Sequence, residues 1–281
     1  MEQHETLFAR LSSQQSGATR WINAAVPGTG PSDHWTRLPA LISQANPRLV
    51  ALALYVGNDF ADVQLGGASR YEIVDGMLTT REPNESVARK LRKALVRQSR
   101  LLQALRAWQF SLENRATAES ATPQWDRWKR EFASVHLRSP PSATRDSIRD
   151  TLDYLDQMQR YCRDRQIEFL LIVIPPSFQV RPDGYDELKR ALKLTDQEID
   201  LDRPQRLLLE WAEKAECPIV DLLPAFREHY ARDPDQPLYH YPDAHWNANG
   251  HRLAADTVLD TLNEVQQQAV SRRLPEKDSR P

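Results

Sequence analysis

Cysteine is scarce in this sequence, with two residues in 281. Cys162 and Cys217 form no Cys-x-x-Cys motif and are too few for a disulfide scaffold, so we expect both to be small buried hydrophobes. No run of about 18 apolar residues occurs, so the sequence predicts no transmembrane helix. The opening residues, Met-Glu-Gln-His-Glu, are polar and acidic and do not resemble a signal peptide.

The sequence also lacks an excess of either charge. Lys and Arg number 37 against 39 Asp and Glu, a formal net charge of -2. A broad basic surface is therefore excluded, and we expect no nucleic-acid partner. The length and the hydrophobic content of 40% are those of a globular protein with one or two domains.

Two apolar segments, Arg48–Val56 and Ile167–Ile174, are typical of parallel strands covered on both faces. Shorter runs at Arg20–Val26 and Pro218–Leu222 also predict strands. Helical spacing predicts helices near 6–11, 32–44, 144–162, 185–194, 202–215 and 250–265. This alternation predicts an open α/β sheet, in which ligands bind at the carboxyl ends of the strands.

Helix starts are indicated by capping residues. Ser32 or Asp33 is expected to cap the helix that runs to about residue 44. Asp202 is expected to cap a later helix, with Pro204 in its first turn.

Residues 60–140 read as an insertion. Tyr71 to Leu78 predicts a hairpin around Asp75-Gly76, and 84–114 has the spacing of a long helix with a basic face. We favour a packed helix there over a membrane-surface or partner helix, because acidic residues balance the chain. Trp125, Trp128 and Phe132 are expected on a short helix that covers the core. We expect one domain over 1–265 and a flexible tail at 266–281.

The stretch from Leu238 to His251 is the richest in chemistry. Asp243 and His245 lie two residues apart, after a proline and just before a predicted helix. A histidine can take and return a proton near neutral pH, and a carboxylate can orient it. The alternative is that Asp243 caps the following helix while His245 and Trp246 pack against it.

Three motifs, in this order, resemble the SGNH (GDSL-type) hydrolase superfamily. They are the Asn23 to Gly28 turn, Gly57-Asn58-Asp59 after a strand, and Asp-x-His-Trp-Asn-x-x-Gly at 243–250. The resemblance runs from about residue 5 to about residue 262. It implies a three-layer, flavodoxin-like α/β sandwich with a mostly parallel central sheet. It also implies hydrolysis or transfer of an acyl or O-acetyl group on a small-molecule or carbohydrate ester, without a cofactor or metal.

The resemblance assigns four residues. The backbone N–H of Gly28 and the side-chain amide of Asn58 would form the oxyanion hole, His245 would be the catalytic base, and Asp243 would orient it. Donors aimed at a developing oxyanion are worth about 3 kcal/mol each. The spacing Asp-x-His differs from the Asp-x-x-His of many relatives.

The nucleophile of the resemblance is missing. No Gly-Asp-Ser and no Gly-x-Ser-x-Gly occurs, while Ser12, Ser13 and Ser16 suit a helix end and loop, and Ser32 suits a helix cap. The family strand that carries this serine would lie between the strands expected at 20–26 and 48–56. The protein could extend upstream of Met1, be an inactive remnant, or fill the slot with another strand. We favour the first, and therefore expect little turnover from these 281 residues.

Two further functions remain open from the sequence. One is a non-catalytic carbohydrate- or acyl-binding module that keeps the cleft. The other is a metal-dependent hydrolase that uses His240, Asp243, His245 and His251. As it stands the chain would be cytoplasmic, but a leader or anchor encoded upstream would change that. The sequence leaves localisation and oligomeric state undetermined.

Overall fold

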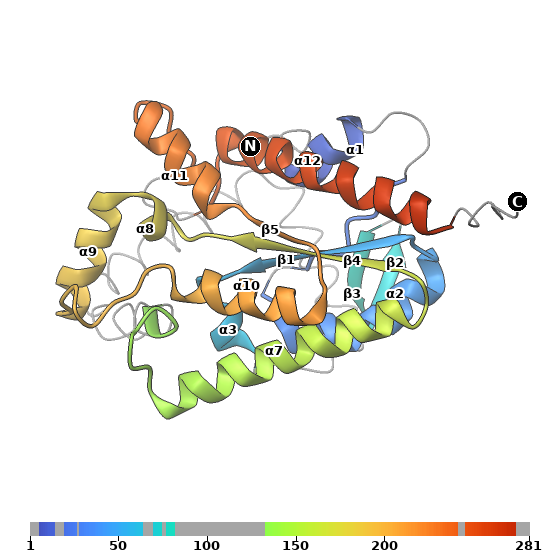
Figure 1. Ribbon diagram of the computed structural model, residues 1–281, viewed down its shortest axis with the longest axis horizontal. Coiled ribbons are helices and arrows are strands. Elements are labelled where there is room, and N and C mark those ends of the chain that lie inside the picture. Colours follow the sequence, from blue (N-terminus) through green and yellow to red (C-terminus); the bar gives the residue numbers. More distant parts are fainter. Residues whose placement is uncertain are drawn as a thin grey trace, which may run out of the picture.

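The computed structural model describes residues 6–14, 20–26, 28–63, 70–74, 77–81, 133–240 and 245–273. Three parallel strands form the central sheet in the order β1-β4-β5: β1 is Leu49–Tyr55, β4 is Glu168–Ile174 and β5 is Ile219–Asp221. The helices lie in a layer on each side of this sheet (Figure 1). The three-layer α/β sandwich that the sequence predicted is confirmed.

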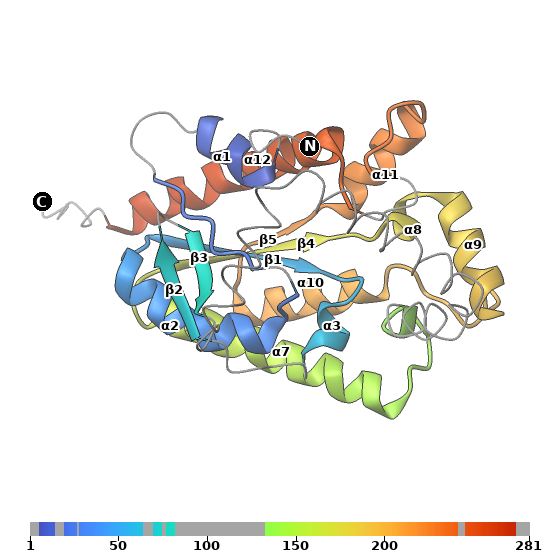
Figure 2. The ribbon, with the colours of Figure 1, turned by 180° about the vertical axis from the view of Figure 1, so that it is seen from behind.

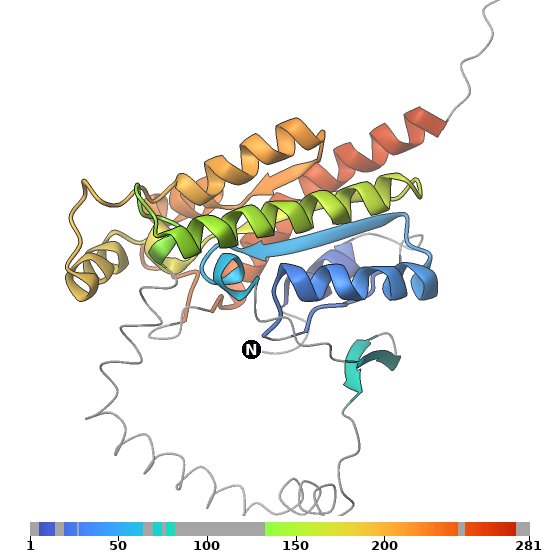
Figure 3. The same ribbon diagram turned by 90° about the horizontal axis from the view of Figure 1, so that it is seen from below.

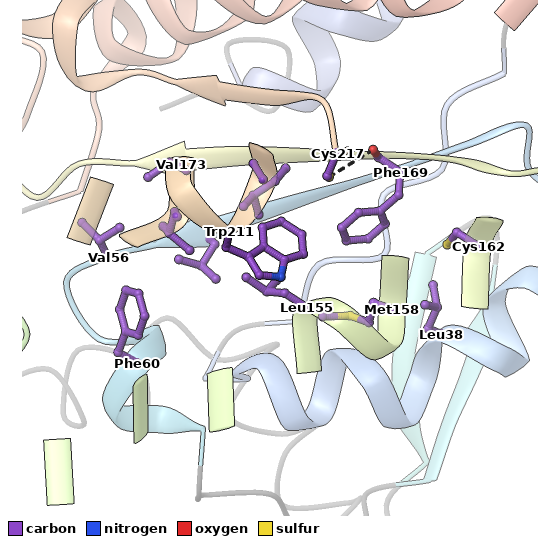
Figure 4. Packing of buried hydrophobic residues seen from close by; sticks show 14 of the residues in the cluster. Leu38, Val56, Phe60, Leu155, Met158, Cys162, Phe169, Val173, Trp211 and Cys217 are labelled. Atoms are coloured by element: carbon purple, nitrogen blue, oxygen red, sulfur yellow. Dashed lines mark hydrogen bonds between the residues drawn. The ribbon is translucent and has the colours of Figure 1, made fainter. Parts of the chain in front are cut away.

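One layer contains α2 (Pro31–Ala45), α7 (Ser142–Arg163) and α10 (Arg203–Ala215). Their apolar faces meet the side chains of one sheet face in a cluster centred on Trp211 (Figure 4). Phe169, Leu171 and Val173 of β4 point into this cluster, as expected from the alternation of side chains along a strand. Cys162 and Cys217 are buried free thiols here, as predicted.

The opposite layer contains α1 (Leu7–Gln14), α11 (Leu223–Arg232) and α12 (Ala248–Arg273). Leu170 and Ile172 of β4 point to this side and pack with Phe226, Val258 and other buried residues. Figure 2 shows this layer from behind, with α1 lying against α12. The run of apolar residues in β4 is therefore explained, because both of its faces are covered.

Short elements complete the described chain. These are α3 (Asp59–Asp62), α8 (Ser177–Val180) and α9 (Pro182–Leu192), with the antiparallel pair β2 (Arg70–Val74) and β3 (Met77–Arg81). The hairpin pairs Val74 with Met77, as the Asp-Gly signal predicted, and it stands apart from the main sheet (Figure 3). The helices expected at 84–114 and around Trp125 lie outside the described residues.

The strand expected at Arg20–Val26 is wrong. Only Asn23 takes part in a β-bridge there, and β1 forms one edge of the described sheet. The Asn23 side chain instead accepts a hydrogen bond from the N–H of Ala25 at 3.0 Å, and the carbonyl of Ala24 accepts one from Arg37 at 3.3 Å. Backbone groups in this segment are thus bonded to side chains, which competes with pairing in a sheet.

Two helix boundaries also differ from the sequence prediction. Gly30, and not Ser32 or Asp33, is the N-cap of α2, while the Asp33 carboxylate accepts the N–H of Gly30 at 3.3 Å. Helix α12 continues to Arg273, beyond the end expected near residue 265. Helix α10 begins directly after Asp202 with Pro204 in its first turn, as predicted, but the Asp202 side chain makes no capping hydrogen bond and instead accepts two from Arg227.

Candidate active site

The carboxyl end of β1 carries the first candidate residue. Val56 donates its N–H to the carbonyl of Ile174 at 3.1 Å, which continues the pairing with β4 to the strand end. Asn58 then forms the N-cap of α3, and its carbonyl accepts the N–H groups of Ala61 and Asp62 at 2.8 Å each. The Asn58 side chain is partly exposed and its amide donates to the Asp62 carboxylate.

Gly28 lies on the turn before α2. It is exposed and has a φ of +71°, a left-handed conformation that glycine adopts without the cost of a side chain. Two residues later the backbone approaches α3 so closely that a Cβ on Gly30 would lie 2.9 Å from the carbonyl oxygen of Asp62. The structure therefore brings the turn with Gly28 next to the short helix that Asn58 caps.

A polar cluster holds this turn. The Arg37 side chain is buried and donates to the carbonyl of Asp33 at 3.1 Å and to the hydroxyl of Thr29 at 3.1 Å. Thr29 in turn donates to the carbonyl of Val26 at 2.8 Å. Burial, with a smaller effect of the Arg37 charge, lowers the pKa of His34 to about 4, so this imidazole is neutral at physiological pH.

His245 lies on a short hairpin between β5 and the last helix. Tyr239 and Trp246 form an antiparallel bridge, and the N–H of His240 donates to the carbonyl of His245 at 2.9 Å. His245 is exposed, whereas the rings of Tyr239 and Trp246 are buried. Asp243 lies outside the described residues, so its relation to His245 remains a prediction.

The hairpin is fastened to the strand ends. The Tyr239 hydroxyl donates to the carbonyl of Pro175, directly after β4, at 2.9 Å. Burial, with a smaller effect of the nearby Tyr55 hydroxyl, raises the pKa of Tyr239 well above its ordinary value. The Tyr55 ring folds over Gly57, where a Cβ would lie 2.4 Å from it. The loop with Asn58 follows β1, and the hairpin with His245 is bonded to the residue after β4. Because β1 and β4 pair in parallel, both segments lie at the carboxyl end of these two strands.

The N-terminus of α12 is capped by Asn247, and Asp243, the cap considered from the sequence, lies outside the described residues. Asn247 precedes α12, and its side-chain oxygen accepts the N–H groups of Asn249 at 2.9 Å and Gly250 at 3.1 Å. Asn247 is thus the residue that caps the helix, in the manner usual for asparagine. Trp246 packs against Phe226, with ring centroids 5.2 Å apart, and His245 beside it is exposed.

A buried carboxyl beside Asn58 was not recognised from the sequence. Asp59 is 7% exposed and accepts the N–H of Tyr55 at 2.8 Å. Burial, and to a lesser extent the Asp62 charge, raise its pKa to about 7, against the opposing effect of the Tyr55 hydrogen bond. Its place in Gly-Asn-Asp was visible in the sequence, but its burial depends on how α3 packs.

Three of the four serines considered as replacement nucleophiles lie within the described residues. Ser12 and Ser13 are exposed on α1, and the Ser13 hydroxyl donates to the carbonyl of Arg10 at 2.9 Å. Ser32 is buried in the first turn of α2. Ser16 lies outside the described residues.

The ligands of the metal-site alternative are partly engaged elsewhere. Nδ1 of His251 accepts the N–H of Leu7 at 3.1 Å, and its ring packs edge-on against Trp246. Within the described ranges, no three His, Cys, Asp or Glu side chains lie together as metal ligands would.

None of the described helices is long and apolar enough to cross a membrane.

Comparison with protein families decides the relationship. Residues 132–278, just over half of the chain, match the SGNH hydrolase-like domain of the acetyltransferase AlgX. The chain belongs to this family. Comparison with curated proteins finds no match. SGNH membership supports a function on acyl groups or esters, and the matched residues include Asp243 and His245 but neither Gly28 nor Asn58.

Proposed function

We propose that this chain acts on an acyl or O-acetyl ester through an SGNH-type site. His245 serves as the general base, Asp243 orients it, and the Gly28 N–H with the Asn58 amide binds the oxyanion. The observation that supports the proposal is that the Asn58 loop follows β1 while the His245 hairpin is bonded through Tyr239 to the residue after β4, the parallel neighbour of β1. This is the carboxyl end of the parallel sheet, where α/β folds bind ligands.

The chemistry follows the serine-hydrolase scheme. A serine oxygen attacks the ester carbonyl and passes its proton to His245, while the carbonyl oxygen gains negative charge and is bound by the two donors. Collapse expels the alcohol, which takes the proton from His245, and leaves an acyl-enzyme. Water then hydrolyses this intermediate, or a second alcohol accepts the acyl group. Because the matched family model is that of an acetyltransferase, both hydrolysis by water and transfer to a second alcohol are tested.

The experiment measures turnover of p-nitrophenyl acetate by the 281-residue protein and by the same protein preceded by the residues encoded upstream of Met1. We expect little turnover from the shorter form, because no Gly-Asp-Ser is present. We expect turnover by the longer form that His245→Ala abolishes and that Asn58→Ala lowers by roughly 100-fold. A matched control is His229→Ala, whose imidazole lies on α11 and bonds to the carbonyl of Gln236.

The second candidate is a non-catalytic module that binds carbohydrate or acyl groups, favoured by the missing nucleophile motif. It predicts no turnover by either form and ligand binding that survives His245→Ala. Brisk turnover by the shorter form that depends on His245 would instead show that a serine within these 281 residues is the nucleophile.

A further inference from the structure

The Asn58 amide and the Gly28 turn share one neighbour, the side chain and backbone of Asp62. The Asn58 amide nitrogen donates to the Asp62 carboxylate. Gly30 also lies against Asp62. A Cβ added to Gly30 would lie 2.9 Å from the carbonyl oxygen of Asp62 and 3.1 Å from the Cβ of Asp62. No resemblance or family match assigns a role to Asp62.

The chemistry of the pair fixes which way the amide faces. An ionised carboxylate only accepts hydrogen bonds, so it selects the nitrogen of Asn58 and excludes its oxygen. The two N–H bonds of a planar amide diverge by about 120°, so one points to Asp62 and the other is turned away from it. A flipped amide would present oxygen to a developing oxyanion and repel it.

The backbone holds Asp62 in place for this task. Asp62 donates its N–H to the carbonyl of Asn58 at 2.8 Å, so the two residues are joined through both main chain and side chain. The Asp62 side chain is partly buried, which reduces the screening of its charge by water.

We propose that Asp62 is a positioning residue, which orients the Asn58 amide as a donor and sets the Gly28 turn beside it through the contact with Gly30. This deepens the proposed function and rests on it, because it takes Asn58 and Gly28 as the oxyanion donors. Asp62 touches neither substrate nor reacting atoms in this role and acts through its two neighbours.

The experiment uses the full chain with isotope-labelled asparagine and glycine, followed by NMR, with acetate as the probe of the oxyanion site. We compare Asp62→Ala with Asp62→Asn, whose amide oxygen can still accept the Asn58 hydrogen bond. The Asn58 signal is assigned with Asn58→Ala, and Asp186→Ala on α9 is the control for loss of a surface carboxylate.

In the wild type and in Asp62→Asn we expect two widely separated Asn58 amide proton signals, both sensitive to acetate together with the Gly28 N–H. In Asp62→Ala the two signals converge, and the acetate dissociation constant rises roughly tenfold, which corresponds to loss of one ordered hydrogen bond. Unchanged Asn58 signals in Asp62→Ala overturn the proposal. If acetate shifts neither the Asn58 amide signals nor the Gly28 N–H signal in the wild type, the proposed oxyanion site is wrong. The convergence of the Asn58 amide signals in Asp62→Ala still tests the role of Asp62 separately.

Discussion

The carboxyl of Asp59 illustrates how burial changes the chemistry of one residue. It is the first residue of α3, and its pKa of about 7 means that it is largely protonated in mildly acidic solution. Its neighbour Asp62 is partly exposed and raises the pKa of Asp59 by its charge. Asp59 and Asp62 are the same residue type three positions apart, yet one carboxyl is buried and the other is partly exposed. This difference in burial cannot be read from the sequence.

Asp59→Asn should be more stable than the wild type, by an amount that grows as pH rises. The pKa of Asp59 in the folded protein lies above the ordinary aspartate value of 3.8, so the folded state binds the proton more tightly. Ionisation therefore lowers the free energy of unfolding as pH rises from about 4 to about 7, and the loss is complete above that. We expect the variant, whose amide oxygen still accepts the Tyr55 N–H, to gain on the order of a few kcal/mol at about pH 8.

Urea unfolding of both proteins at several pH values measures this difference. The gain should shrink as pH falls toward 4, where the wild-type carboxyl is protonated in both states. A difference that does not change with pH would contradict the burial of Asp59.

At the level of elements, the site depends on how closely α2 and α3 approach each other. Gly30 begins α2 and lies against Asp62 at the end of α3, so one missing side chain allows two helices from different parts of the chain to meet. The hairpin with His245 is fixed in a comparable way, because Tyr239 is bonded to the residue after β4 and Asn247 caps α12. Gly28, Asn58 and His245 therefore each lie on a connection that a neighbouring element holds in place.

Gly30→Ala should separate α2 from α3 and lower the free energy of unfolding by about 1–3 kcal/mol, because the new Cβ meets a backbone oxygen that cannot rotate away. Gly28→Ala is the matched variant, since nothing lies within 4 Å of its Cβ position. Only its left-handed conformation is penalised, at about 1–2 kcal/mol.

Chemical unfolding of the two variants gives the comparison, and NMR signals of Asn58 show whether α3 has moved. We expect the Asn58 signals to shift in Gly30→Ala and to stay in Gly28→Ala. Equal shifts in both would argue against a contact between Gly30 and Asp62 that sets the position of α3.

For the molecule as a whole, two apolar clusters cover the two faces of one narrow sheet. β4 contributes to both, with Phe169, Leu171 and Val173 on one side and Leu170 and Ile172 on the other. Because the same strand carries both layers, we expect the layers to unfold together and not as separate units.

Leu155→Ala in α7 and Leu262→Ala in α12 test this. Both side chains are fully buried, one in each cluster, so each truncation should cost about 2–5 kcal/mol. The two losses should add within about 0.5 kcal/mol, since the two side chains belong to different clusters on opposite faces of the sheet. Urea unfolding followed by fluorescence and circular dichroism should give one coincident transition; separate transitions would show that the layers are independent.

The sequence alone determined the elements whose signals are local. The apolar run at 167–174 marked β4, and Pro204, which the first turn of a helix accepts, marked the start of α10 after Asp202. The motifs at 57–59 and 243–250 indicated the SGNH relationship, which the family match confirms at superfamily level.

Tertiary structure decided what depends on residues distant along the chain. The apolar segment at 20–26 forms no strand, and Arg37 from α2 bonds the carbonyl of Ala24 within it, while Asn247 caps α12. The raised pKa of Asp59 and the contact of Asp62 with both Asn58 and Gly30 also follow from packing. Periodicity and capping signals report only on near neighbours, whereas burial, charge and hydrogen-bond partners are set by the elements that fold against them.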